Sequence, residues 1–184
     1  MRELSVELFS TLDGYGDGGP QSAPYWGYGG PGLFEWMHAK LAEEHIMVMG
    51  ATSYRMMSKI VAEQDDPTFP RMAELRKIVF SKTLTESTWA NTTIVDEPVE
   101  TAMPKIKAEA DGLPLRTVGS PSLVRSLFKL GLVDRIRTMI FPTIHGTAGE
   151  GPLYTELPDL RLDLDGTAVI DDRLVLLDYR VDRS

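Results

Sequence analysis

The stretch PLRTVGSPSLVRSLFKL, residues 114–130, runs from a short apolar segment through glycine, serine and proline into helical spacing. Because proline favours the first turn of a helix, the pattern predicts a strand from Pro114 to Val118 and a helix from Pro121 to Leu130. We expect Ser120 to cap this helix. Glycine followed by the unpaired amides of a helix start can also hold a phosphate. An ordinary capped helix explains the motif equally well, so both interpretations stay open here.

Two other parts of the sequence show the same order of strand, small or hydroxyl residues and helix. The run IMVM at 46–49 ends at Gly50-Ala51-Thr52-Ser53 and leads into an expected helix from about Ser53 to Ala62. The run KIVF at 77–80 leads into Ser81-Lys82-Thr83. In an open α/β sheet, ligands bind outside the carboxyl ends of the strands. We therefore expect three loops, around Gly50, Ser81 and Gly119, to converge on one crevice.

The remaining periodicity predicts alternating strands and helices. We expect helices over 33–44 and 99–110. Because proline inside a helix costs about 3 kcal/mol, we expect the regular part of the second to begin near Met103, with Pro104 in its first turn. Expected strands are 4–9, 88–95, 135–141 and a hairpin within 160–182. This order predicts an α/β fold: a mostly parallel sheet with helices on both faces and a closing antiparallel hairpin.

The segment from Gly14 to Gly32 is rich in glycine and proline and carries four aromatic residues, Tyr15, Tyr25, Trp26 and Tyr28. Glycine and proline at this density predict a long loop without a regular element, and the rings supply area for binding. We therefore expect a loop near a site. A surface insert without a binding role is the alternative.

Composition limits the class of protein. The chain has 184 residues, 42% of them hydrophobic, no cysteine and a formal net charge of -8. The absence of cysteine removes disulfides and thiolate sites, and no apolar run approaches the roughly 20 residues of a membrane span. We expect one cytoplasmic domain over 1–184. Its ligand should be a small molecule and not nucleic acid or a membrane, because a negative surface repels both.

Few residues stand out as candidates for chemistry. Asp13 could face a substrate, although Asp-Gly is a turn dipeptide, and Glu35 could donate a proton if it pointed into the crevice, although a solvated helix face is the default. The three histidines lack the spacing of a helical metal pair, so no metal site is expected. His145 lies in a glycine-rich turn and could touch a ligand. The G-x-G-x-x-G and G-x-x-x-x-G-K-[ST] motifs are both absent.

The order of the motifs resembles a known family. FSTLDGY (9–15), LFEWM (33–37), VMGATSY (48–54), IVFSKTL (78–84), TVGSPSLVRSLFKLGLVDRI (117–136) and IFPTIHGTAGEGPLY (140–154) follow one another. Together they resemble the dihydrofolate-reductase-like superfamily, in the group that contains the reductase domain of bacterial riboflavin biosynthesis, the C-terminal domain of the bifunctional deaminase-reductase. The resemblance spans nearly the whole chain.

This resemblance implies a three-layer fold with about eight strands, NADPH bound across the carboxyl edge of the sheet, and a homodimer. The residues that it implies for the cofactor are Gly50, Ala51, Thr52, Ser53, Ser81, Lys82, Thr83, Val118, Gly119, Ser120, Ser122, Leu123 and Val124. Those that it implies for the substrate are Tyr15, Trp36, Thr138, Phe141 and Pro142. Relatives usually carry arginine where this chain has Ala51, so a preference for NADPH over NADH rests on Lys82 and Arg55.

These observations predict an NADPH-dependent reductase, an oxidoreductase that transfers hydride to a C=N or C=O group of a small heterocyclic metabolite of the pyrimidine or pterin type. The cofactor would carry the chemistry, and the protein would hold donor and acceptor close together. A non-catalytic nucleotide- or ligand-binding protein on the same fold is the alternative, since a fold does not decide a function.

Overall fold

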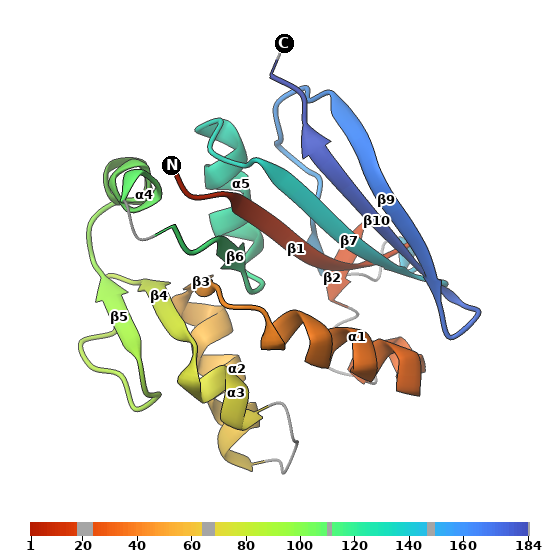
Figure 1. The fold of residues 1–184 in the computed structure, drawn as a ribbon, viewed down its shortest axis with the longest axis horizontal. Coiled ribbons are helices and arrows are strands. Elements are labelled where there is room, and N and C mark those ends of the chain that lie inside the picture. The colour runs from red at the N-terminus through yellow and green to blue at the C-terminus, as the bar shows by residue number, and fades with distance from the viewer. Residues whose placement is uncertain (18–23, 64–68, 110–111, 147–149, 184) are drawn as a thin grey trace.

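The computed structural model describes residues 1–17, 24–63, 69–109, 112–146 and 150–183. Its centre is an eight-stranded sheet (Figure 1). In spatial order the strands are β5 (Thr92–Val95), β4 (Arg76–Phe80), β3 (Ile46–Gly50), β6 (Leu115–Thr117), β1 (Leu4–Thr11), β7 (Arg135–Phe141), β10 (Leu174–Val181) and β9 (Leu162–Ile170). The first six are parallel, and β10 is antiparallel to both of its neighbours. The expected mostly parallel sheet with a closing hairpin is confirmed.

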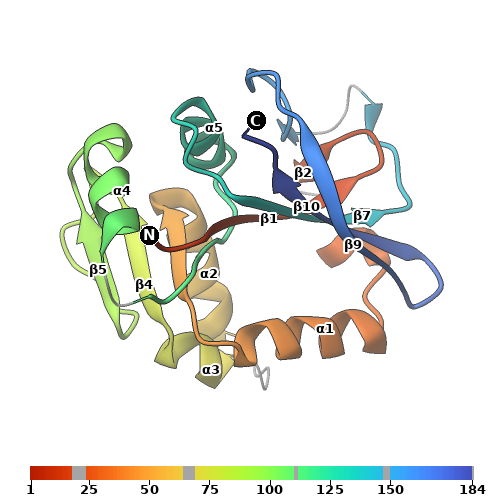
Figure 2. The same cartoon turned by 45° about the horizontal axis from the view of Figure 1, so that its top comes forward.

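Helices cover both faces because the strands are apolar on both sides. On β3, Ile46 and Val48 pack into the core beneath α4 (Val99–Ala108) and α5 (Pro121–Lys129). Met47 and Met49 point the other way, into the core shared with α2 (Ala51–Glu63) and α3 (Phe69–Glu74). α1 (Pro31–Ala42) covers β7 and β10 on this second face (Figure 2). The three-layer α/β fold is therefore confirmed.

The start of α4 differs from the expectation. The helix begins at Val99, and Pro104 lies inside it and not in its first turn. Ala102 and Met103, in the turn that precedes the proline, are 5% and 0% exposed. The burial of this turn against the sheet outweighs the backbone hydrogen bond that proline cannot make.

Three other local features differ from what the sequence predicted. The strand expected from Thr88 begins at Thr92, because Asn91 has a left-handed φ of 57° and Trp89 turns into the core. The glycine-rich segment contains a short strand, β2 (Tyr15–Asp17), which pairs with β8 (Glu150–Pro152), and a turn of 3-10 helix at Pro24–Gly27. Helix α3 was not expected at all. Each of these elements is too short to give a periodic signal.

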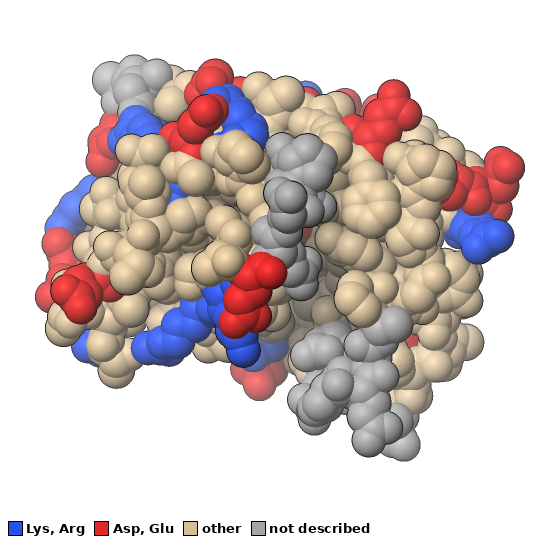
Figure 3. Space-filling view, turned by 90° about the horizontal axis from the view of Figure 1, so that it is seen from below, with Lys and Arg blue, Asp and Glu red and all other residues tan. Residues whose placement is uncertain are grey.

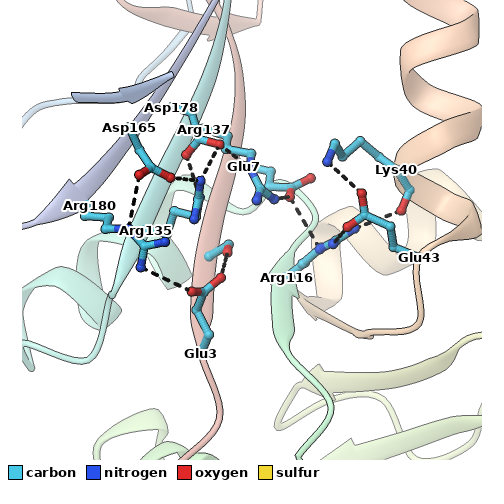
Figure 4. Close-up of polar contacts among 11 residues, drawn as sticks. Glu3, Glu7, Lys40, Glu43, Arg116, Arg135, Arg137, Asp165, Asp178 and Arg180 are labelled. Carbon is cyan, nitrogen blue, oxygen red and sulfur yellow. Dashed lines mark hydrogen bonds and ion pairs between the residues drawn. The ribbon is translucent and has the colours of Figure 1, made fainter. Parts of the chain in front are cut away.

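A network of ion pairs lies on the face of the sheet that carries α1 (Figure 4). Arg137 of β7 bonds both Glu7 of β1 and Asp178 of β10, each at 2.8 Å. Arg116 of β6 pairs with Glu43, directly after α1, and donates to the carbonyl oxygen of Lys40 at 2.8 Å. The network therefore fixes the C-terminal end of α1 to the middle of the sheet.

The charges on the surface are mixed. On the face seen from below (Figure 3), uncharged residues predominate, and acidic and basic side chains lie near one another both at the margins and close to the middle. Among the described residues, no helix is long and apolar enough to cross a membrane.

Candidate functional site

A cleft lies where two neighbouring strands send their chains to opposite faces of the sheet. β3 leads into α2 on one face, and the adjacent β6 leads into α5 on the other. Such a switch point opens a crevice at the carboxyl edge, where open α/β sheets bind ligands. A cleft of about 680 Å³ occupies this place. The structure thus puts the loops at Gly50 and Gly119 side by side, as the sequence predicted.

Two serines hold these loops together. The hydroxyl of Ser120 accepts a hydrogen bond from the amide of Gly50 at 2.9 Å and lies 2.8 Å from the hydroxyl of Ser53. A Cβ atom on Gly50 would lie 2.6 Å from Ser120 Oγ, and one on Gly119 would lie 2.8 Å from Ser53 Oγ. Both glycines are therefore needed for the close approach of the loops to each other.

The expected cap at Ser120 is wrong. The residue precedes α5 with a left-handed φ of 64°, and its side chain makes no capping hydrogen bond. Its hydroxyl is engaged with Gly50 and Ser53 instead, and its left-handed backbone departs from the extended conformation that an N-cap residue usually has. The first amides of α5 stay available at the cleft.

Two helix starts therefore line one cavity. Its wall includes the expected residues Gly50, Ala51, Thr52, Ser53, Ser120, Ser122 and Leu123. Sequence reasoning missed Arg125 and Ser126, which also line it. The signal was present, because Ser122, Arg125 and Ser126 fall at i, i+3 and i+4 on the helix face opposite the buried Val124, Leu127 and Phe128. The wall offers hydroxyls, helix amides and the Arg125 guanidinium, which suit an anion such as a diphosphate, and it also includes the carboxylate of Glu156.

A smaller groove of about 280 Å³ adjoins the cleft, and Phe80 and Val99 line both. It contains Ser81 and Lys82 of the third expected loop, together with Asp96, Glu97 and Glu100. Thr83 accepts a hydrogen bond from Arg55 at 3.0 Å. The basic residues expected at the adenosine end of the cofactor, Lys82 and Arg55, are therefore near this groove, but carboxylates share the groove with Lys82.

Two of the residues implied for the cofactor lie behind the cleft wall. Val124 is 1% exposed within the core under α5, and Val118 packs against the core on the opposite face. Their side chains support the loop between them without lining the cavity.

The residues implied for the substrate are spread over two faces of β7. Phe141 is buried with Trp36 in the aromatic cluster beneath α1, and the carbonyl oxygen of Pro142 accepts from the Tyr28 hydroxyl at 3.3 Å. Thr138 is on the other face, 3.2 Å from the hydroxyl of Tyr154. Tyr15 pairs with Pro152 between β2 and β8. The structure thus brings Trp36, Phe141 and Pro142 together, and it separates them from Thr138.

The two carboxylates named for catalysis have different settings. Asp13 accepts hydrogen bonds from Thr11 Oγ1 at 2.6 Å and from the amides of His145 and Gly146 at 3.1 and 2.7 Å. The Thr11 hydroxyl, together with the two amides, lowers the pKa of Asp13. Asp13 therefore organises the turn after β7. Glu35 is on the exposed side of α1.

The comparisons with known proteins decide the family. A family model described as the RibD C-terminal domain matches residues 2–176. The chain belongs to the RibD C-terminal domain family. No match was found among curated proteins.

Solved structures share the RibD C-terminal fold. A protein described as one of riboflavin biosynthesis from Shewanella sp. PV-4 has a TM-score of 0.73 and 21% identity, over 98% of this chain and 99% of that one. A pyrimidine reductase-like protein from Corynebacterium diphtheriae has a TM-score of 0.64 and 16% identity, over 100% and 93%. RibD from Acinetobacter baumannii has a TM-score of 0.67 and 12% identity, and the match covers 99% of this chain but 58% of RibD. At these identities the likeness supports the fold.

In the part of the chain that the structure describes, no group of three or more histidine or acidic residues is placed to hold a metal ion.

Proposed function

We propose that this RibD C-terminal domain protein is an NADPH-dependent reductase that transfers hydride to a C=N or C=O group of a small heterocyclic metabolite of the pyrimidine or pterin type. The observation that carries the proposal is the meeting of two helix starts, α2 and α5, in one cleft at the switch point of the sheet. The descriptions of similar structures, riboflavin biosynthesis and pyrimidine reductase-like, agree with it.

The residues at the cleft fit a dinucleotide. The amides that begin α2 and α5, with Thr52, Ser122 and Arg125, would hold the diphosphate. The adjoining groove with Lys82 would take the adenosine end. The nicotinamide supplies the hydride when the cofactor is bound. The chain's own part is to orient the two rings and exclude water, and Gly151 and Pro152 of β8 form part of the cleft wall.

The substrate ring would lie near the ends of β1 and β7, beside Trp36 and Phe141. Asp13 acts there as a positioning residue, because its carboxylate is occupied by the Thr11 hydroxyl and two backbone amides. Glu35 stays a prediction as a proton donor, and it would need a conformation of the site in which α1 turns that side chain toward the substrate.

Calorimetric titration with NADPH, followed by a screen of pyrimidines, pterins and simple carbonyl compounds that records NADPH absorbance, tests the proposal. Binding together with turnover of at least one compound is expected. Binding without any turnover would favour the alternative, a non-catalytic nucleotide-binding protein. Absence of binding would contradict both.

We also propose a homodimer formed through one face of β9 and β10. By the strand register, the side chains on this face are Leu162, Leu164, Thr167, Val169, Val175, Leu177, Tyr179 and Val181. Leu164 and Val169 are 58% and 68% exposed. None of these side chains is charged. In a chain of net charge -8, such a face suits a second copy, because a twofold axis would otherwise set like charges against each other.

The expected organisation as one domain over 1–184, the cytoplasmic location and the absence of nucleic-acid or membrane partners stay predictions.

A further inference from the structure

Two consecutive residues at the edge of the substrate side hold a conformation that side chains disfavour. Tyr25 and Trp26 have φ values of 53° and 51°, both left-handed. Such residues persist only where the surroundings hold them, and they concentrate at functional sites. Here the surroundings are aromatic rings. Tyr25 lies 5.8 Å from Phe9 in an edge-on contact, and Trp26 lies 4.8 Å from Phe141.

The same place contains two buried polar atoms without a partner, Trp26 Nε1 and His145 Nε2. The two rings are 6.4 Å apart. Asp13 accepts a hydrogen bond from the backbone amide of His145 at 3.1 Å and so holds this residue in the turn after β7. A buried N–H group without an acceptor is destabilising, and such groups in a native structure call for an explanation.

Trp89 Nε1 is also unpartnered, but its setting differs. Trp89 packs in the core with Tyr54 and lies over the ammonium of Lys77. Its φ is not among the left-handed values. Trp26 alone combines an unpartnered indole, backbone strain and a place at the carboxyl ends of β1 and β7, among the described tryptophans.

We propose that the turn Pro24–Gly27 is a plug: its Tyr25 and Trp26 rings fill the substrate side of the site, and a planar heterocycle with a carbonyl edge displaces them. This inference rests on the proposed function, which puts the substrate ring at the same strand ends. Displacement would release Tyr25 and Trp26 from their left-handed backbone conformation. It would also leave the face of Phe141 for stacking, and it would offer the Nε atoms of Trp26 and His145 to the polar edge of the ring.

The geometry also indicates the class of ligand. The rings that surround the plug, Phe9, Phe34, Trp36 and Phe141, are apolar and suit a flat, uncharged body. An indole N–H can only donate, so the edge that it meets must carry an acceptor. A neutral ring with carbonyl groups meets both conditions, whereas an apolar ring of equal size meets only the first.

The test uses the full chain labelled with 5-fluorotryptophan, whose three resonances are assigned with single Trp→Phe variants. NADPH is added first, then quinazoline-2,4-dione, with naphthalene as the ring of equal size without a polar edge. We expect the dione to shift the Trp26 resonance and leave that of Trp89 in place. Trp26→Phe should weaken dione binding about tenfold, as the loss of one hydrogen bond predicts, while Trp89→Phe should not.

Binding of the dione with an unmoved Trp26 resonance, equal dione affinity in Trp26→Phe, or equal affinity for naphthalene would each overturn the plug. So would NADPH binding without any dione binding, and that result would leave the proposed function standing. A wild-type protein that binds no NADPH would overturn the proposed function and the plug with it.

Discussion

The carboxylate of Asp171, in the turn between β9 and β10, accepts hydrogen bonds from the backbone amides of Gly32 and Leu33 at 2.8 and 3.0 Å. These amides begin α1, whose own N-cap residue, Gly30, has no side chain to serve them. A Cβ on Gly30 or Gly32 would lie 2.5 or 2.7 Å from an Asp171 oxygen. A residue about 140 positions along the chain therefore caps the helix, and the glycines leave room for it.

Asp171→Asn tests this long-range cap. Asparagine tolerates the left-handed φ of 52° at this position but keeps only one acceptor oxygen and loses the charge that favours a helix start. We expect the free energy of unfolding to fall by about 1 kcal/mol. Urea denaturation measures it. Asp159→Asn, a change of the same type at an exposed residue, should stay within about 0.5 kcal/mol. Equal stability of Asp171→Asn and wild type would show that α1 does not need the cap.

This cap also shows what the sequence could and could not predict. Strand β3 was predictable because its apolar run is continuous. The cleft was predictable because three strands lead into loops of small and hydroxyl residues. The function of Gly30 and Gly32 was not predictable, because the carboxylate that they accommodate is distant in the sequence. For the same reason Ser120 was expected to cap its own helix, whereas its partner is Gly50, 70 residues away. Local sequence patterns predict local structure, whereas these contacts join residues that are far apart in the sequence.

The ion pairs of Glu43 predict that the free energy of unfolding depends on pH in the acid range. Burial raises the pKa of this carboxyl, but the hydrogen bonds from Lys40 and Arg116 outweigh it and lower the pKa to about 2. A carboxyl with a depressed pKa in the folded protein stabilises the fold above its unfolded value of 4.5, and this contribution is lost as pH falls toward 2. Because the side chain is 46% exposed, solvent screening limits the effect to about 1 kcal/mol or less.

The measurement is the free energy of unfolding of wild type and Glu43→Gln between pH 5 and the acid limit of folding. The difference between the two should shrink as pH falls, and added salt should reduce it. A difference that stays constant across the titration would mean that Glu43 contributes nothing through its charge.

Cofactor preference depends on the balance of charge beside Lys82. A charge-assisted hydrogen bond to the 2'-phosphate of NADPH contributes roughly 1.5 to 3 kcal/mol, so Lys82→Ala should lose most of any preference for NADPH over NADH. Asp96 and Glu100 line the same groove and would repel that phosphate. Asp96→Asn with Glu100→Gln should therefore raise the NADPH affinity and leave the NADH affinity nearly unchanged. Calorimetric titration with both cofactors measures these affinities. Equal affinities in all variants would show that the adenosine end does not bind in this groove.

The dimer proposed through β9 and β10 predicts opposite results for two neighbouring positions. Val169→Asp puts a charge on the uncovered apolar face, whereas Ala168→Asp puts the same charge on the other face of the same strand. Light scattering after size exclusion should show a monomer for the first and a dimer for the second. A wild-type monomer, or a dimer in both variants, contradicts this surface.

The contact between Ser120 and Ser53 should matter for stability and for cofactor binding at once. Ser120→Ala leaves the Gly50 amide and the Ser53 hydroxyl without their partner in a buried place, which costs about 1 to 3 kcal/mol. Because the same contact holds the starts of α2 and α5 together, we expect the NADPH affinity to fall as well. Ser122→Ala is the matched change on the cleft wall, two residues along the chain from Ser120. It should weaken NADPH binding through the loss of one hydroxyl while the free energy of unfolding stays within about 0.5 kcal/mol of wild type.

Urea denaturation and calorimetric titration of both variants separate the two effects. If Ser120→Ala lost stability but bound NADPH as wild type does, the two helix starts would not have to be held together to bind the cofactor.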